Sequence, residues 1–364
     1  MICAGGTGGG VYPALAVHNA LKTLCPDELE TLWVGGDGGM EAGLVERAGI
    51  PFKAIPAAGL HGVEITRLPG NLLLLARGML ASRRILAEFR PDVLFFTGGY
   101  VAVPMALAGR SLASLLYVPD IEPGLALKTL ARFATRITLT AEQSKPFFSP
   151  KAEMIVTGYP IRPELAHWTK KAARTKLGLK SSLPVLLVFG GSKGAHSINL
   201  AVLEHIEHLL EQMEVVHISG QSDWELVESF SRQLPKGVSK RYHAFSYLHA
   251  EMGAALTVAD LVVSRAGAST LGEYPRFGLP AILVPYPYAW RYQKVNAEVL
   301  AKAGGALVIE DGKLKSGLYL TVEKLFESPE KLESMRQAVR SLDVPDAADR
   351  IAAQLIDLAG AKHG

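Results

Sequence analysis

The residues best suited to chemistry lie in two glycine-rich segments, AGGTGGG at 4–10 and FGGSKGA at 189–195. Each follows a short apolar run typical of a β-strand and precedes a helical pattern. Glycine lets backbone N–H groups approach a phosphate with no Cβ in the way, and the following helix start adds a positive dipole. We therefore predict phosphate contacts at Gly5, Gly6, Thr7, Gly8, Gly9 and Gly10 in the first segment, and at Gly190, Gly191, Ser192, Lys193 and Gly194 in the second.

Two further strand-to-helix turns carry polar or small residues. FFTGGYVAVP at 95–104 places Gly98, Gly99 and Tyr100 after a strand, where ligands of open α/β sheets bind. A second turn, SRAGASTLGE at 264–273, puts Ala268, Ser269 and Thr270 at a helix start, with Glu273 one turn later. A carboxylate there can accept both hydroxyls of a ribose, although a first-turn glutamate also serves as a simple capping residue.

Other nucleotide-site signatures are weaker. The second segment lacks the GxxxxGK[ST] spacing of a P-loop, which argues against an ATPase. The first segment departs from GxGxxG, and Asp37 is only a poor candidate for the acidic residue that a dinucleotide site needs after its second strand. A tight structural turn remains the alternative for the first segment and for the turn at Gly98 and Gly99.

Strand-like runs alternate with helical patterns along the whole chain, which predicts an α/β protein with parallel sheets. The length of 364 residues favours two domains. We predict two Rossmann-like domains facing a cleft, one over 1–160 plus a C-terminal helix at about 342–364, the other over 161–341. The expected strands are 31–34, 52–55, 93–96, 115–118 and 155–156, then 185–189, 215–218, 261–264, 281–284 and 306–309.

Composition narrows the class of partner. The net charge of +3 argues against general nucleic-acid binding, and two cysteines without a CxxC pair indicate neither a disulfide framework nor a metal site. No run reaches the ~18 apolar residues of a membrane span, so we expect a cytoplasmic protein that is soluble or peripheral. Only three residues precede Ala4, which predicts that the natural first strand begins earlier than this chain does.

Seven motifs in order resemble one family: GGTGGGVYPALAV, GLHG, TGGYVAVP, GYPIRPEL, GGSKGAHSIN, SRAGASTLGE and YQKVNA. The chain is similar to the bacterial peptidoglycan N-acetylglucosaminyltransferases, two-domain enzymes of the B-type glycosyltransferase fold. The resemblance implies transfer of N-acetylglucosamine from UDP-N-acetylglucosamine to the lipid-linked acceptor lipid I, forming lipid II, without a cofactor or metal.

The resemblance implies that the C-terminal domain binds the UDP donor. The second glycine segment would meet the diphosphate with Arg162 nearby, and Glu273 would hold the ribose. Gln293 would contact the sugar, with Asn296 close to it. Leu248 marks the segment that would enclose the uracil of UDP.

By the same resemblance the N-terminal domain binds the acceptor, with the diphosphate at Gly5–Gly10 and Gly98–Tyr100. The leucines at 72–75, interleaved with arginines, fit a patch that contacts an anionic bilayer, although core packing explains part of that pattern. We expect a peripheral protein on the inner face of the cell membrane. Proteins of the wall-synthesis machinery are candidate partners.

Two departures from the family fall in the acceptor half. Gly10 stands where the family usually has histidine, and YVPDIEPG at 117–124 replaces a HEQN stretch. The general base would then be Asp120, our slight preference, or Glu122, with His61 as a third candidate; the alternative for Asp120 is a helix N-cap. Other readings remain open: a related transferase with a different lipid or glycoside acceptor, a UDP-N-acetylglucosamine 2-epimerase, or a silent UDP-sugar-binding paralogue.

Overall fold

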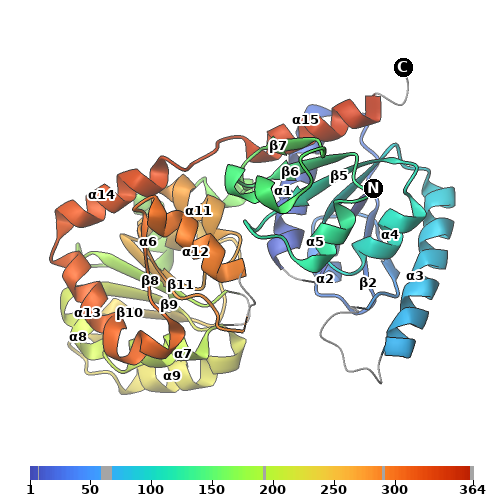
Figure 1. The fold of residues 1–364 in the computed structure, drawn as a ribbon. Helices are drawn as coiled ribbons and strands as arrows, with labels where there is room; N and C mark the ends of the chain where they lie inside the picture. Colours follow the sequence, from blue (N-terminus) through green and yellow to red (C-terminus); the bar gives the residue numbers. More distant parts are fainter. Residues whose placement is uncertain (7, 59–67, 192–193, 289–291, 361–364) are drawn as a thin grey trace. The chain divides into compact units, whose positions relative to one another are not determined.

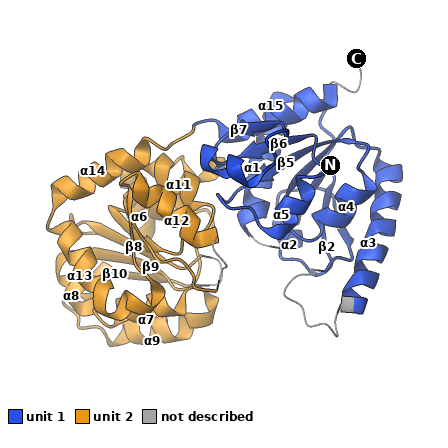
Figure 2. Ribbon diagram, in the orientation of Figure 1, with its two compact units in different colours: residues 1–162, 345–364 blue, residues 163–344 orange. Residues whose placement is uncertain are grey.

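A computed structural model describes residues 1–6, 8–58, 68–191, 194–288 and 292–360 (Figure 1). The chain forms two compact units, one of residues 1–162 and 345–364, the other of residues 163–344 (Figure 2). The boundary lies between Arg162 and Pro163, inside the GYPIRP segment. Each unit carries one parallel sheet flanked by helices, which confirms the predicted α/β class with parallel sheets.

Unit 1 has a seven-stranded sheet in the order β3-β2-β1-β4-β5-β6-β7. Buried apolar side chains such as Val34, Phe96 and Val118 fill its core. The C-terminal helix α15 packs against α1 and β5, and Arg136 of β6 reaches Gln354 and Asp357 at 2.7 and 2.8 Å. The elements are β1 (Ile2–Ala4), α1 (Gly8–Leu24), β2 (Trp33–Gly36), α2 (Glu41–Arg47), β3 (Phe52–Ile55), α3 (Leu68–Phe89), β4 (Val93–Gly98), α4 (Ala102–Ala108), β5 (Ala113–Val118), α5 (Leu125–Leu130), β6 (Arg136–Leu139), the 3₁₀-helix η2 (Glu142–Phe147), β7 (Met154–Val156) and α15 (Ala347–Gly360).

Unit 2 has a six-stranded sheet in the order β10-β9-β8-β11-β12-β13. Its core gathers around Leu186, Val263 and Ile282. The elements are η3 (Pro163–Leu165), α6 (Lys170–Leu177), β8 (Val185–Phe189), α7 (His196–Leu203), α8 (Ile206–Gln212), β9 (Glu214–Ile218), η4 (Gln221–Asp223), α9 (Trp224–Gln233), η5 (Ser239–Arg241), β10 (Tyr242–Phe245), α10 (Met252–Val258), β11 (Leu261–Ser264), α11 (Thr270–Phe277), β12 (Ala281–Leu283), α12 (Tyr292–Lys302), β13 (Ala306–Val308), η6 (Asp311–Lys313), α13 (Leu314–Phe326) and α14 (Pro329–Arg340).

Both sheets place their first strand next to their fourth, so the glycine-rich turns after these strands share one sheet edge. In unit 1, β1 pairs with β4 and Ala4 faces Gly98. In unit 2, β8 pairs with β11 and Phe189 faces Ser264. Parallel pairing brings the carboxyl ends together, which is where α/β sheets bind ligands. Within the described residues, no helix has the length and apolar character needed to span a bilayer.

Candidate active site

The two glycine turns of unit 1 lie directly against each other. Gly99 has a φ of +86°, and a Cβ there would lie 2.6 Å from the carbonyl oxygen of Gly5. Thr97 Oγ1 donates to the carbonyl of Gly10 at 2.8 Å. Glycine is required at position 99 because a side chain would separate the two turns. The structure thus brings together the two segments predicted to face one crevice.

A buried acid sits beneath the first of these turns. Glu41 begins α2 and is 1% exposed. Its Oε1 accepts from the Gly36 amide at 2.8 Å and its Oε2 from the Gly6 amide at 3.2 Å. A Cβ at Gly5 would overlap with this carboxylate. One of the predicted phosphate donors, the Gly6 amide, is therefore already bonded to the protein's own anion.

The first helical turn of α1 carries the remaining donors of this segment. Gly8, Gly9 and Gly10 are its first three residues, and the first amides of a helix have no partner inside it. The Tyr12 ring lies over Gly8, where a Cβ would come within 3.1 Å of it, and the Arg162 guanidinium stacks on that ring at 4.3 Å from its centroid. Arg162, expected near the donor, thus belongs to unit 1 and lies beside the start of α1. Thr7 is outside the described residues.

Both candidate bases after β5 are located, and they differ in environment. Asp120 is half-buried, whereas Glu122 is 8% exposed and has Lys128 Nζ at 3.9 Å. Helix α5 has Gly124 at its N-cap, so the interpretation of Asp120 as an N-cap is wrong. The third candidate, His61, lies outside the described residues.

The glycine turn of unit 2 is shaped by backbone contacts. Gly191 and Gly194 have φ values of +86° and +80°. A Cβ at Gly194 would overlap with the carbonyl oxygen of Ser219, and one at Gly190 would overlap with the backbone of Ala195. The turn leads into α7, which starts at His196. Ser192 and Lys193, the predicted side-chain donors, lie outside the described residues.

The turn between β11 and α11 lies at the same carboxyl edge of the unit 2 sheet. Thr270 Oγ1 donates to the Gly267 carbonyl at 2.7 Å, which closes the turn, and Ala268 is buried within it. Glu273 lies half-buried in the first turn of α11. Ser269 occupies the N-cap position without a side-chain bond there. A carboxylate and the start of a helix therefore share this edge, as predicted.

The other three residues predicted to bind the UDP donor, Gln293, Asn296 and Leu248, lie in different environments. Gln293 Oε1 accepts from the Tyr286 amide at 2.8 Å, which ties α12 to the loop after β12. Asn296 is fully buried, and its Nδ2 donates to the Ala266 carbonyl at 3.2 Å, so it supports the β11 turn from beneath. Leu248 is 9% exposed in the segment after β10.

A hydrogen-bonded side-chain network, missed in the sequence, packs behind the unit 2 glycine turn. Asn199 Nδ2 donates to Asp223 Oδ2 at 2.6 Å, and Asp223 Oδ1 pairs with His196 Nδ1 at 2.9 Å. The side-chain Oδ1 of Asn199 accepts from His217 Nε2 at 2.9 Å, and the Tyr242 hydroxyl donates to His217 Nδ1 at 2.8 Å. Burial lowers the pKa of His217 to about 4, so its ring is neutral near pH 7.

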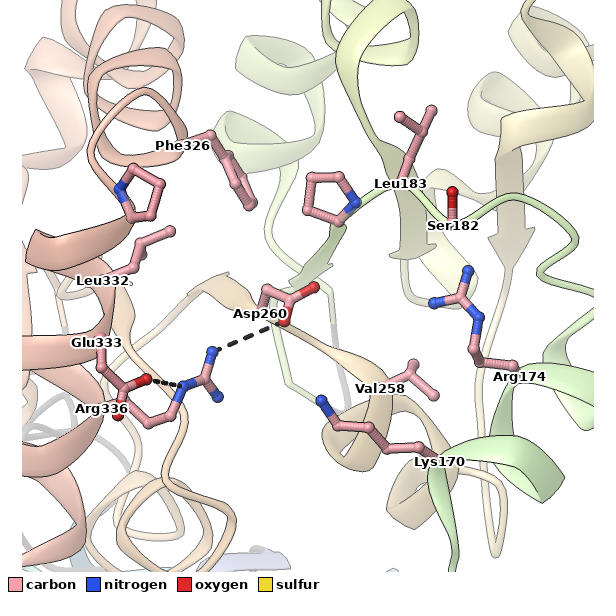
Figure 3. Close-up of a pocket in the computed structure, with 12 residues that line it drawn as sticks. Lys170, Arg174, Ser182, Leu183, Val258, Asp260, Phe326, Leu332, Glu333 and Arg336 are labelled. Atoms are coloured by element: carbon pink, nitrogen blue, oxygen red, sulfur yellow. Dashed lines mark ion pairs between the residues drawn. The ribbon is translucent and has the colours of Figure 1, made fainter.

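A separate cavity of about 510 Å³ opens at the amino ends of β8 and β11, the edge opposite the glycine turns (Figure 3). Arg336 lies between Asp260 at 3.7 Å and Glu333 at 3.4 Å, and Arg174 pairs with Glu214. These side chains are paired with one another, and the glycine-rich turns lie at the other edge, so we keep the candidate site at the carboxyl edge. Across the described ranges, no cluster of three or more metal-ligating side chains occurs.

Comparison with known proteins agrees with this geometry. The N-terminal domain model of glycosyltransferase family 28 matches residues 1–139, and its C-terminal domain model matches residues 185–351. A transferase from Roseiflexus sp. (strain RS-1) is 39% identical, covering 96% of this chain and 93% of that protein. A relative of the same name from Desulforudis audaxviator (strain MP104C) is also 39% identical, covering 99% and 98%.

Solved structures extend the likeness. The crystal structure of Acinetobacter baumannii MurG superposes with a TM-score of 0.76 at 25% identity, covering 98% of this chain and 99% of that one. A Neisseria meningitidis UDP-GlcNAc 2-epimerase has a TM-score of 0.70 at 14% identity, covering 98% and 99%, a likeness of fold alone. The chain belongs to the family of UDP-N-acetylglucosamine–N-acetylmuramyl-(pentapeptide) pyrophosphoryl-undecaprenol N-acetylglucosamine transferases.

Proposed function

We propose that this protein transfers N-acetylglucosamine from UDP-N-acetylglucosamine to lipid I, which gives lipid II for peptidoglycan synthesis. The observation that carries the proposal is the full-length identity of 39% to transferases of that name. The two parallel sheets, each with glycine turns at its carboxyl edge, supply a matching architecture.

We assign the UDP donor to unit 2. The turns after β8 and β11 lie on adjacent strands, so the starts of α7 and α11 can both direct backbone amides at one diphosphate. Glu273 is placed one helical turn further on, where its carboxylate can accept ribose hydroxyls. Leu248 and its neighbours after β10 would cover the base, and Gln293 would contact the sugar.

We assign the lipid-linked acceptor to unit 1, with its diphosphate at the start of α1 and the Gly98–Tyr100 turn. The reaction is one inverting displacement: the acceptor hydroxyl oxygen bonds to the anomeric carbon while the bond to the UDP oxygen breaks. Asp120 takes the hydroxyl proton, because it is the more accessible acid after β5. Helix starts and hydrogen-bond donors stabilise the departing UDP, so the mechanism as assigned uses no metal.

We further propose that α3 rests on the anionic inner face of the cell membrane. Leu72, Leu73 and Leu80 are 56%, 55% and 66% exposed, and Arg83 and Arg84 are exposed on the same helix. Exposed leucines beside arginines are the composition of an interfacial helix. In co-sedimentation with phosphatidylglycerol vesicles, Leu72→Ser with Leu73→Ser should lower binding about tenfold. Leu226→Ser, an exposed leucine of unit 2, should leave binding unchanged.

The departures at Gly10 and at 117–124 favour one second candidate, a transferase of the same donor with a different lipid or glycoside acceptor. Gly10 packs on Thr97, where a Cβ would lie 3.2 Å from the Thr97 carbonyl oxygen, so the turn is built closely around glycine.

The deciding experiment incubates the protein with labelled UDP-N-acetylglucosamine and a short-chain lipid I analogue. Labelled disaccharide product supports the proposal. Free N-acetylglucosamine, a 2-epimer of the donor, or donor binding without turnover would instead indicate, in that order, a different acceptor, an epimerase or a silent paralogue.

A further inference from the structure

Glu41 has a place in the fold that the transfer mechanism does not use. It is an acid 1% exposed, on the first residue of α2, and it folds back onto the ends of β1 and β2. Burial of a carboxylate is costly unless donors surround it. Here the donors are the backbone amides of Gly6 and Gly36, at 3.2 and 2.8 Å.

The carboxylate determines the shape of the first glycine turn. Gly6 has a φ of +87°, and its amide points at Glu41 Oε2 instead of at the open side of the turn. Gly35 and Gly39 also lie so close that a Cβ at either would overlap with the Glu41 side chain. Glycines from two loops are therefore wrapped around one internal anion.

This arrangement fills the crevice that nucleotides use in related sheets. A bound dinucleotide lies between the glycine turn after the first strand and the end of the second strand. In unit 1 the Glu41 carboxylate occupies that position, and its two oxygens are bonded to the Gly6 and Gly36 amides instead of to a ribose. Among the described residues, the amides that donate to this carboxylate are those of Gly6 and Gly36, and not those of Gly8, Gly9 or Gly10.

We propose that Glu41 is a positioning residue for the acceptor: its carboxylate holds the first glycine turn in place and excludes UDP from unit 1, leaving the start of α1 for the acceptor diphosphate. The inference rests on the proposed function and deepens it. It explains how two domains with the same type of glycine turn can take different diphosphates.

The test compares Glu41→Gln with Glu46→Gln, an exposed glutamate on the same helix. Glutamine keeps the shape but turns an NH₂ group toward one of the two amides. The KM for the short-chain lipid I analogue should rise about tenfold or more in Glu41→Gln, with the donor KM within about twofold of wild type. Glu41→Asp, which keeps the charge on a shorter stem, should lie between, and it serves if Glu41→Gln fails to fold.

A second readout does not depend on turnover. Residue-resolved hydrogen exchange should show the Gly6 amide exchanging about tenfold faster in Glu41→Gln than in Glu46→Gln. If the acceptor KM stays unchanged, or both KM values rise together, Glu41 does not position the acceptor. If wild type gives no transfer, the proposed function fails, and unchanged exchange at Gly6 would then separately overturn the role of Glu41 in the turn.

Discussion

The two units share a strand order but use their acids differently. In each sheet the third, second, first, fourth, fifth and sixth strands lie in that sequence, and unit 1 adds β7. Each second strand is followed, five residues later, by an acid: Glu41 after β2 and Asp223 after β9. Glu41 accepts from the backbone amide of the glycine turn, whereas Asp223 accepts from side chains of α7.

This difference teaches that a glycine-rich turn does not by itself specify a nucleotide site. In unit 2 the acid is bonded to the side chains of Asn199 and His196 on α7. In unit 1 the acid occupies part of the turn. If the proposed assignment holds, redirecting one carboxylate is enough for the same fold to separate a nucleotide donor from a lipid-linked acceptor.

The largest effect should come from the base in unit 1. Asp120→Asn should lower kcat by about 10²-fold or more, because no carboxylate then takes the hydroxyl proton of the lipid acceptor. The UDP donor site should stay intact. Steady-state transfer assays would measure this, with Glu122→Gln as the matched variant. A large loss in Glu122→Gln alone would assign the base to the buried acid instead.

Glycine substitutions should separate an open turn from a closed one. Gly6→Ala places a Cβ where nothing lies within 4 Å, so only its φ of +87° is strained, which costs about 1–2 kcal/mol. Gly194→Ala adds an overlap with Ser219, so its total should reach about 3 kcal/mol. Urea unfolding measures the free energy of unfolding of both variants. Equal decreases would show that the backbone around Gly194 shifts to make room for the added Cβ.

Acid should weaken the network behind the unit 2 turn. The pKa of His217 is lowered to about 4 by burial, below the ordinary value of 6.5, so the unfolded chain binds the proton more readily. The free energy of unfolding therefore has its full value above about pH 6.5 and is lower by about 2 kcal/mol at pH 5. His217→Gln should reduce this loss.

The control variant is His208→Gln, because this side chain is exposed and lies outside the network. Burial lowers the pKa of His18 in unit 1 to about 4 as well, so part of the acid sensitivity should remain in His217→Gln. This account of the network would be contradicted if the free energy of unfolding fell equally with pH in wild type, His217→Gln and His208→Gln.

The smallest effect should be on donor affinity. Glu273→Gln should raise the donor KM about tenfold, because a charged acceptor of ribose hydroxyls becomes a neutral one. The acceptor KM should not change. Glu225→Gln is the control, since Glu225 also stands in the first turn of a helix but is exposed on α9. Equal effects of the two variants would mean that Glu273 acts only on its helix.

The pattern of the chain predicted most of the fold. Apolar runs gave strands at 52–55, 185–189 and 261–264 with the bounds that the structure has. Two strands were missed, Arg136–Leu139 and Tyr242–Phe245. Both are four residues long and carry polar side chains, RITL and YHAF, so neither has the apolar run that identifies a buried parallel strand.

The places of the candidate residues could be predicted where a turn follows a strand, as the turn at Gly99 follows β4 and the turn before α11 follows β11. Glu41 was missed because a first-turn glutamate on a short helix is typical of a dipole-matched residue. Its contact with Gly6 crosses 35 positions, and no local pattern reports such a distance. Asp37, the acid considered for this place, is exposed. The glycines at 35, 36, 38 and 39 were the one available signal that something packs closely there.

The division between the units is tested most directly by hydrogen exchange with and without UDP. The account predicts protection in peptides covering 185–200 and 264–275, with exchange unchanged in peptides covering 1–12 and 95–104. Protection of 1–12 by UDP would contradict it, because it would place the nucleotide at the turn that Glu41 occupies.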